Sequence, residues 1–277
     1  MQSHTWKLAI IVCFFSFEML LPQESWAQKP RKPTLVEWQL FRPYSERLGD
    51  WQPKDLVYQD VEFESADGTQ LHGWFCRRDK PKAVVLFSHG NEGNVAMRAF
   101  FLSQLTTNLN ISVFVFDYRG FGKSQGVPTI DGALQDARAA RAKLCELNSI
   151  KDSDMILMGE SLGGAIAVQL AAESAPRGLV LQSTFSSLRE AANQLFPQLA
   201  FLVRPDLLDS TSRIAGYSGP LFQSHGNADR TLSIQLGMKL FEAANEPKTF
   251  FEVPGADHNN WLTVGYLNAL SEFIKKN

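Results

Sequence analysis

This chain has few cysteines and a net charge close to zero. Its 277 residues include three cysteines, and 27 basic side chains against 29 acidic ones leave a formal net charge of −2. Three cysteines do not make a disulfide framework, and no cysteine–histidine cluster has the spacing of a zinc site. Cys76 falls in a predicted strand and Cys145 in a predicted helix, where we expect buried free thiols. The charge balance gives no sign of a nucleic-acid partner or an anionic membrane partner, and the sequence gives no candidate metal ligands.

Long apolar runs are also missing, except at the N-terminus. Lys7 precedes a mostly apolar stretch at residues 8–21, and Ser25-Trp26-Ala27 places small residues where a signal peptidase reads. The stretch is too short to span a bilayer comfortably. It predicts a signal peptide at residues 1–27, cleaved after Ala27. We therefore expect a secreted or periplasmic protein with no stable transmembrane segment after cleavage.

Two other interpretations of the N-terminus fit the sequence less well. An uncleaved anchor is disfavoured by the short run and by Glu18 within it. A lipoprotein signal would acylate Cys13, but Cys13 lies inside the run and follows Val12, where a small residue is expected. Removing 27 of the 277 residues leaves 250, which suits one large α/β domain with a full core.

Residues 28–55 form a lead-in before the regular pattern begins. The basic, proline-containing stretch at 28–33 predicts disorder. Aromatic and turn residues are mixed over 34–54, and we expect an irregular segment packed on the domain.

Residues 56–277 are predicted to form the domain itself. An antiparallel hairpin opens it, because strand-like stretches at 57–63 and 70–77 flank the turn signal Asp67-Gly68. Apolar runs then alternate with helical stretches, which is typical of a parallel sheet covered on both faces. The expected strands lie at 83–87, 112–116, 155–158, 178–181, 221–223 and 249–253, and the helices at 95–109, 130–147, 162–174, 234–244 and 261–275. We predict an α/β fold with a mostly parallel sheet of about eight strands, helices on both faces and the hairpin at one edge.

The sequence Gly159-Glu160-Ser161-Leu162-Gly163 lies between a predicted strand and a predicted helix. A serine on such a sharp turn projects its hydroxyl clear of the backbone, and the flanking glycines avoid a clash. The helix that follows directs its free N–H groups toward an anion formed beside the serine. This pattern predicts that Ser161 is a nucleophile rather than part of an ordinary tight turn.

A serine nucleophile needs a histidine base near the carboxyl ends of the strands. His258 lies in the loop between the last predicted strand and the last helix, and it is the predicted base. His89 and His225 also follow strands, but early in their loops, and His72 lies within the hairpin.

The orienting carboxylate is expected between the serine and the histidine in the chain. Asp229 fits best, because it comes just after the strand at 221–223. Asp206 and Asp209 are alternatives within an excursion that precedes that strand. Asp257 adjoins His258, so their side chains diverge, and Asp117 precedes the serine and is expected to be structural.

An oxyanion hole needs two backbone donors. The N–H of Leu162 follows the nucleophile directly and is the first predicted donor. The glycine-containing loop at 88–94 lets its backbone approach a ligand, and the N–H of Asn91 is the second. The alternative is that this loop is only a glycine-rich turn.

These motifs together resemble the α/β-hydrolase superfamily. The similarity rests on the serine elbow, on Ser88-His89-Gly90-Asn91, on the stretch at 117–124, and on the loops around Asp229 and His258. The loop that begins at His89 is most similar to the branch with fungal polarity-linked hydrolases and animal protein depalmitoylases. The resemblance implies an α/β-hydrolase fold and a Ser–His–Asp triad of Ser161, His258 and Asp229. Arg230 departs from it, since many relatives have Val-Pro after the acid.

The resemblance does not define a substrate, because this fold hosts esterases, thioesterases and peptidases. Residues 184–219 stand where many relatives insert a lid, and the apolar stretch at 195–203 is predicted either to roof an acyl pocket or to pack on the core. We predict a cofactor-free serine hydrolase of esters or thioesters, acting on a small-molecule or acyl-bearing substrate. The alternatives are a serine peptidase of the same fold and a catalytically silent binding protein.

Overall fold

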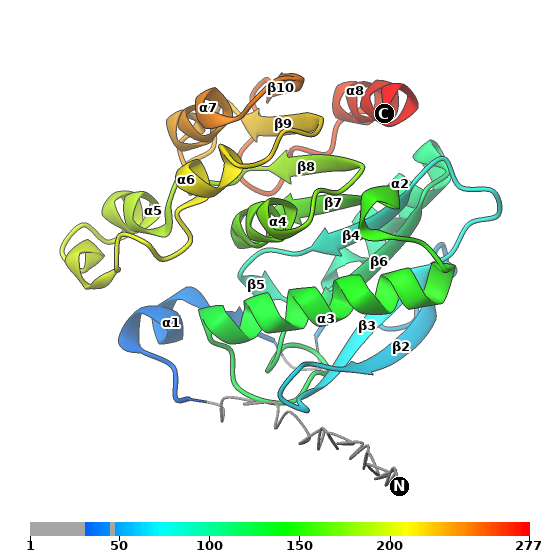
Figure 1. Cartoon of the computed structure of the whole chain (residues 1–277), viewed down its shortest axis with the longest axis horizontal. Coiled ribbons are helices and arrows are strands. Elements are labelled where there is room, and N and C mark those ends of the chain that lie inside the picture. Colours follow the sequence, from blue (N-terminus) through cyan, green and yellow to red (C-terminus); the bar gives the residue numbers. More distant parts are fainter. Residues whose placement is uncertain (1–30, 45–47) are drawn as a thin grey trace, which may run out of the picture.

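A computed structural model describes residues 31–44 and 48–277, so the predicted signal peptide lies outside the described residues. Eight strands form one sheet in the order β10-β9-β8-β7-β4-β6-β3-β2 (Figure 1). Within this sheet only β3 pairs antiparallel, with β2 on one side and β6 on the other, so the hairpin lies at the sheet edge. The strands are β2 (Gln59–Glu64), β3 (Gln70–Cys76), β4 (Val84–Ser88), β6 (Ser112–Asp117), β7 (Met155–Glu160), β8 (Gly178–Gln182), β9 (Leu221–Gly226) and β10 (Lys248–Val253). This arrangement confirms the predicted fold class.

Helices cover both faces of the sheet. On one face Val85 of β4 packs in the core that includes α2 and α8, and on the other its neighbour Leu86 packs with α3 and α4. Successive side chains of a strand point to opposite faces, so burial of both faces requires the continuous apolar runs seen in the sequence. The helices are α2 (Ala99–Leu109), α3 (Ile130–Asn148), α4 (Leu162–Glu173), α7 (Ile234–Ala243) and α8 (Val264–Lys276), and a 3₁₀ turn η1 (Val95–Arg98) precedes α2.

The segment before the hairpin is more regular than predicted. It contains a helix, α1 (Leu35–Leu40), followed by a short strand, β1 (Arg42–Pro43), that pairs in parallel with β5 (Glu92–Gly93). Thr34 caps α1 by accepting the N–H of Glu37, and the Glu37 carboxylate accepts the N–H of Thr34 at 2.8 Å. The Thr-x-x-Glu spacing of a capping box is present in the sequence and could have predicted this helix.

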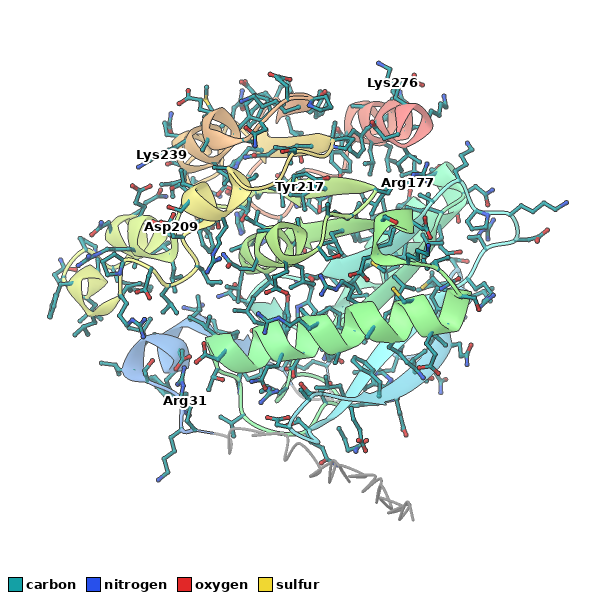
Figure 2. All side chains as sticks on the ribbon, viewed as in Figure 1. Arg31, Arg177, Asp209, Tyr217, Lys239 and Lys276 are labelled. Atoms are coloured by element: carbon teal, nitrogen blue, oxygen red, sulfur yellow. The ribbon has the colours of Figure 1, made fainter. Side chains whose placement is uncertain are left out.

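The buried Glu37 carboxylate attaches α1 to the domain. It accepts two hydrogen bonds of 2.6 Å from Arg31 and one of 2.8 Å from the backbone N–H of Ile130, at the start of α3. Figure 2 shows Arg31 next to α1. Burial raises the pKa of Glu37, but the bonds from Arg31, Thr34 and Ile130 outweigh it and lower the pKa from 4.5 to about 2. The carboxylate therefore remains charged, which the N-terminus of α3 favours.

Residues 184–219 form three short elements: α5 (Leu188–Leu195), η3 (Ala200–Leu202) and α6 (Ser210–Ile214). The apolar stretch at 195–203 is thus not one helix. Pro197 disfavours helical backbone at Phe196, and α5 ends one residue earlier. Figure 1 shows α1 and α5 at the same end of the molecule, although they are far apart in the sequence.

Both cysteines in the described part of the chain are free thiols. Cys76 on β3 is buried and Cys145 on α3 is half-buried. None of the helices in the described ranges is long and apolar enough to cross a lipid bilayer.

Candidate active site

Ser161 lies on the tight turn between β7 and α4. Its backbone has φ 53° and ψ −119°, a strained conformation for a residue with a side chain. The two flanking glycines are required by packing: a Cβ on Gly159 would lie 2.2 Å from the carbonyl oxygen of Gly163, and one on Gly163 would lie 2.0 Å from that of Ser88. The turn therefore has the geometry that the Gly-x-Ser-x-Gly spacing predicts.

Asp229 and His258 meet at the carboxyl end of the sheet. Asp229 follows β9, His258 lies between β10 and α8, and Asp229 Oδ2 is 2.7 Å from His258 Nδ1. Each residue is 9% exposed. With Nδ1 directed at the carboxylate, Nε2 of the imidazole is left for a second partner.

The Asp229 carboxylate is held by several donors. Its Oδ1 accepts the backbone N–H groups of Thr231 at 2.9 Å and Leu232 at 2.8 Å, and Oδ2 lies 3.2 Å from Nε2 of the buried His225. Burial raises the pKa of Asp229, but hydrogen bonds from His225, His258 and the backbone outweigh it and hold the pKa well below its usual range. The carboxylate is therefore ionised and fixed in orientation.

Ser161 and His258 both line one cavity, and Ser161 is 7% exposed. Within the described residues no hydrogen bond joins the Ser161 hydroxyl to the imidazole. Such bonds are often long before substrate binds. The structure thus brings the predicted serine, histidine and aspartate to one site.

The other candidate acids have different surroundings. Asp206 is exposed and pairs with Arg204, while Asp209 caps α6 by accepting the N–H of Ser212 at 3.1 Å (Figure 2). Asp257 pairs with Arg230. The imidazole of His258 is hydrogen-bonded to Asp229 and not to any of these three carboxylates.

Asp117 and His89, which the sequence analysis also considered for the site, are buried in the core. Asp117 is fully buried and accepts the N–H of Val95 at 2.9 Å. His89 is fully buried as well, and burial lowers its pKa to about 3, so its imidazole is neutral. Both therefore support the loop after β4 rather than face the cavity.

The loop after β4 passes over Ser161. A Cβ on Gly90 would lie 3.6 Å from Ser161 Cβ, and the next residue, Asn91, lines the cavity together with Leu162. Within the described residues, neither Asn91 nor Leu162 donates its backbone N–H to another group. These are the two positions predicted for the oxyanion donors.

The segment around α1 holds this loop from outside. The backbone N–H of Arg42 donates to the carbonyl of Asn91 at 2.8 Å, and that of Tyr44 to Gly93 at 3.3 Å. In addition, the side-chain amide of Asn91 donates to the carbonyl of Leu40 at 2.7 Å. The lead-in segment is therefore part of the site, which the sequence patterns did not predict.

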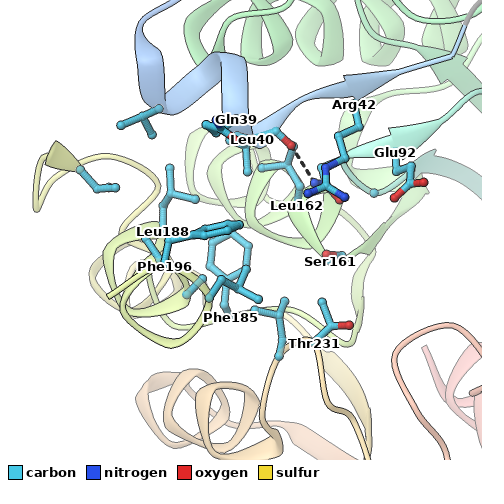
Figure 3. A pocket seen from close by; sticks show the side chains of 18 of the residues that line it. Gln39, Leu40, Arg42, Glu92, Ser161, Leu162, Phe185, Leu188, Phe196 and Thr231 are labelled. Atoms are coloured by element: carbon cyan, nitrogen blue, oxygen red, sulfur yellow. Dashed lines mark hydrogen bonds between the residues drawn. The ribbon is translucent and has the colours of Figure 1, made fainter. Parts of the chain in front are cut away.

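A cavity of about 450 Å³ extends from Ser161 between α1 and α5 (Figure 3). Its wall is mainly apolar and combines α1 with the segment from Phe185 to Val203. The apolar lining residues of these two segments are Leu35, Val36, Leu40, Phe185, Leu188, Ala191, Ala192, Leu195, Phe196, Leu199, Leu202 and Val203. Of the stretch at 195–203, Leu195, Phe196, Leu199, Leu202 and Val203 line the cavity, and Val203 also packs in the core. The stretch therefore combines the two arrangements considered for it.

Charged side chains lie near the Ser161 end of the cavity. Figure 3 shows Arg42 and Glu92 there, and Arg98 and Glu160 also line it, with 3.5 Å between Arg98 Nε and Glu160 Oε2. The sequence analysis predicted no role for any of these four side chains, although Glu160 belongs to the serine elbow and Glu92 to the loop at 88–94. Over residues 31–44 and 48–277, no group of three His, Cys, Asp or Glu side chains is arranged to hold a metal ion.

Known proteins resemble this chain in both sequence and structure. A family profile described as "Serine aminopeptidase, S33" matches residues 79–212. The uncharacterized protein YfhR of Escherichia coli (strain K12) is 34% identical over 224 residues, which cover 75% of this chain and 78% of that protein. The α/β hydrolase domain-containing protein WAV2 of Arabidopsis thaliana is 30% identical over 247 residues, 80% of each chain.

A solved structure has the same fold. The Pyrococcus furiosus esterase Pf2001 matches with a TM-score of 0.71, covering 86% of this chain and 98% of that chain at 21% sequence identity. At that identity the likeness establishes a common fold alone.

Proposed function

Because the chain belongs to the α/β-hydrolase superfamily, we propose that it is an exported serine hydrolase that cleaves carboxylic esters or thioesters. The observation that carries the proposal is the apolar cavity that leads to Ser161. An acyl chain fits such a cavity, since its walls offer hydrophobic contact along most of their length. The resemblance to a branch that includes protein depalmitoylases supports thioesters as substrates beside esters.

In the proposed reaction, Ser161 Oγ attacks the acyl carbonyl while His258 Nε2 takes the hydroxyl proton. Asp229 holds the imidazole and stabilises its cation. The backbone N–H groups of Leu162 and Asn91 stabilise the oxyanion. The leaving alcohol or thiol takes the proton from His258, and water then attacks the acyl-enzyme with His258 as base. The acid is released, and Ser161 regains its proton without any cofactor.

A serine peptidase is the second candidate, because the matching family profile is described as an aminopeptidase. An aminopeptidase binds a substrate ammonium group, and Glu92 and Glu160 are the carboxylates that line the cavity. Glu160 lies beside Arg98, however, and Glu92 accepts a hydrogen bond from Tyr44 at 2.7 Å. Both carboxylates therefore already have partners within the protein. Because the rest of the wall is mainly apolar, the cavity favours the ester hydrolase over the aminopeptidase.

A fluorophosphonate probe tests the nucleophile. Wild type and the control Ser103→Ala should be labelled, and Ser161→Ala should not. Equal labelling of Ser161→Ala would contradict the assignment, and an unlabelled wild type would favour the silent binding protein. Nitrophenyl esters of increasing acyl length, compared with aminoacyl nitroanilides, then separate the esterase from the peptidase.

Export is a separate part of the proposal, supported by the sequence of residues 1–27. Mass spectrometry of the natively expressed protein should find an N-terminus at Gln28. A cytosolic protein that retains Met1 would contradict export without affecting the proposed chemistry.

A further inference from the structure

Exposed apolar side chains gather on two of the segments that form the cavity wall. Of the fourteen large apolar residues that are exposed in the described part of the chain, seven lie on α1 or on residues 195–202. We call these seven the apolar rim: Leu35, Trp38, Leu195, Phe196, Leu199, Phe201 and Leu202. Solvent-exposed positions on two such short segments are ordinarily polar. A cluster of exposed apolar side chains like this one is typical of a surface that binds a partner.

The rim has an inner and an outer part. Five of its residues line the cavity, whereas Trp38 and Phe201 do not. Those two side chains are 68% and 70% exposed. Substrate contact inside the cavity explains the inner residues but leaves Trp38 and Phe201 without a role.

The rim also lies at an extremity of the molecule. Figure 1 shows α1 and α5 at one end of the longest axis, beyond the helices that cover the sheet. A bilayer that approaches this end of the domain therefore reaches both segments that carry the rim.

We propose that the apolar rim docks on a lipid bilayer and that the cavity takes an acyl chain directly from it; the second part rests on the proposed function. The apolar lining of the cavity begins at the rim and leads to Ser161, so an acyl chain that enters along it stays in apolar contact. A protein that covered both sides of the rim would close the cavity mouth. Tryptophan, phenylalanine and leucine favour the boundary of headgroups and acyl chains, where an apolar side chain can leave water.

Docking of this kind depends on apolar contact rather than on charge, because the net charge of the chain is −2. The probe is therefore a vesicle of neutral phosphatidylcholine. Co-sedimentation is measured for the mature chain that begins at Gln28, because the apolar stretch at 8–21 would itself bind vesicles. The double variant Trp38→Ser/Phe201→Ser and the control Phe100→Ser are compared in the same mature form. Phe100 is 72% exposed on α2 and lies outside the rim.

Wild type and Phe100→Ser should bind the vesicles alike, and the double variant should bind more weakly by on the order of tenfold for each aromatic side chain. Hydrolysis of a soluble short-chain ester should be unchanged in all three, which shows that the variants fold. Absence of wild-type binding, or equal binding by the double variant, would overturn the docking proposal. So would a wild-type dimer, found by light scattering, that the double variant loses.

Failure of the proposed function has a different signature. If no ester is hydrolysed but the double variant still loses vesicle binding, the result supports the docking surface and contradicts the proposed ester hydrolysis. Circular dichroism then replaces the ester assay as the check of folding.

Discussion

The side-chain amide of Asn91 donates a hydrogen bond of 2.7 Å to the backbone carbonyl of Leu40, 51 residues away in the sequence. Leu40 ends α1, and Asn91 belongs to the loop that passes over Ser161. The bond therefore connects the wall of the cavity to the proposed oxyanion donor. A change in the position of α1 would be transmitted to the site of the proposed chemistry.

Replacing Asn91 with alanine should lower kcat for a short-chain ester by on the order of tenfold, with little change in KM. The backbone donor is kept but loses one of the bonds that hold its loop, whereas loss of a whole oxyanion donor costs on the order of 10² to 10³. Steady-state kinetics measure the effect, with Asn108→Ala on α2 as the matched control. An unchanged kcat would mean that Leu40 does not position this loop.

Replacing Asp229 with asparagine should lower kcat by on the order of 10⁴, the scale known for loss of the orienting acid in a serine triad. Asp209→Asn should have little effect, because asparagine also caps a helix. Circular dichroism must show that both variants keep their fold. If Asp209→Asn were inactive and Asp229→Asn active, the site would have to be redrawn around the end of β8.

Replacing Glu37 with glutamine should reduce the free energy of unfolding at pH 7 by about 2 kcal/mol, because Arg31 and Ile130 lose a charged acceptor. The folded-state pKa lies below the unfolded one, so this stabilisation is complete above pH 4.5 and is lost as the pH falls toward 2. The difference between wild type and variant should therefore shrink over that range. Urea unfolding at about pH 7 and about pH 3 measures it, and the exposed Glu62→Gln is the control. A difference that does not depend on pH would refute the electrostatic explanation.

Filling the cavity should shorten the acyl chain that the enzyme accepts. Ala192→Phe places a ring among the lining residues of α5, so long-chain esters should lose kcat/KM by about tenfold or more while short-chain esters keep theirs. Asn193→Phe is the matched control, because the neighbouring Asn193 is exposed and does not line the cavity. Equal losses for both chain lengths would mean that acyl groups bind elsewhere.

Local sequence patterns predict the hairpin, the buried strands and the turn at Ser161 correctly. Periodicity and glycine placement act over a few residues, so they can be read without knowledge of the fold. The end of α5 before Pro197 and the capping box at Thr34 are also local signals in the sequence. The aromatic and turn residues around Thr34 obscure its helix, because they favour irregular structure.

The position of α1 could not be derived in this way. Its docking depends on the contact of Glu37 with Ile130, and its role in the site depends on the contact of Leu40 with Asn91. Both contacts join segments that are brought together only when the sheet and its helices have assembled. A local pattern holds no information on which distant segment will lie beside it, so the cavity and its apolar rim are products of the tertiary structure.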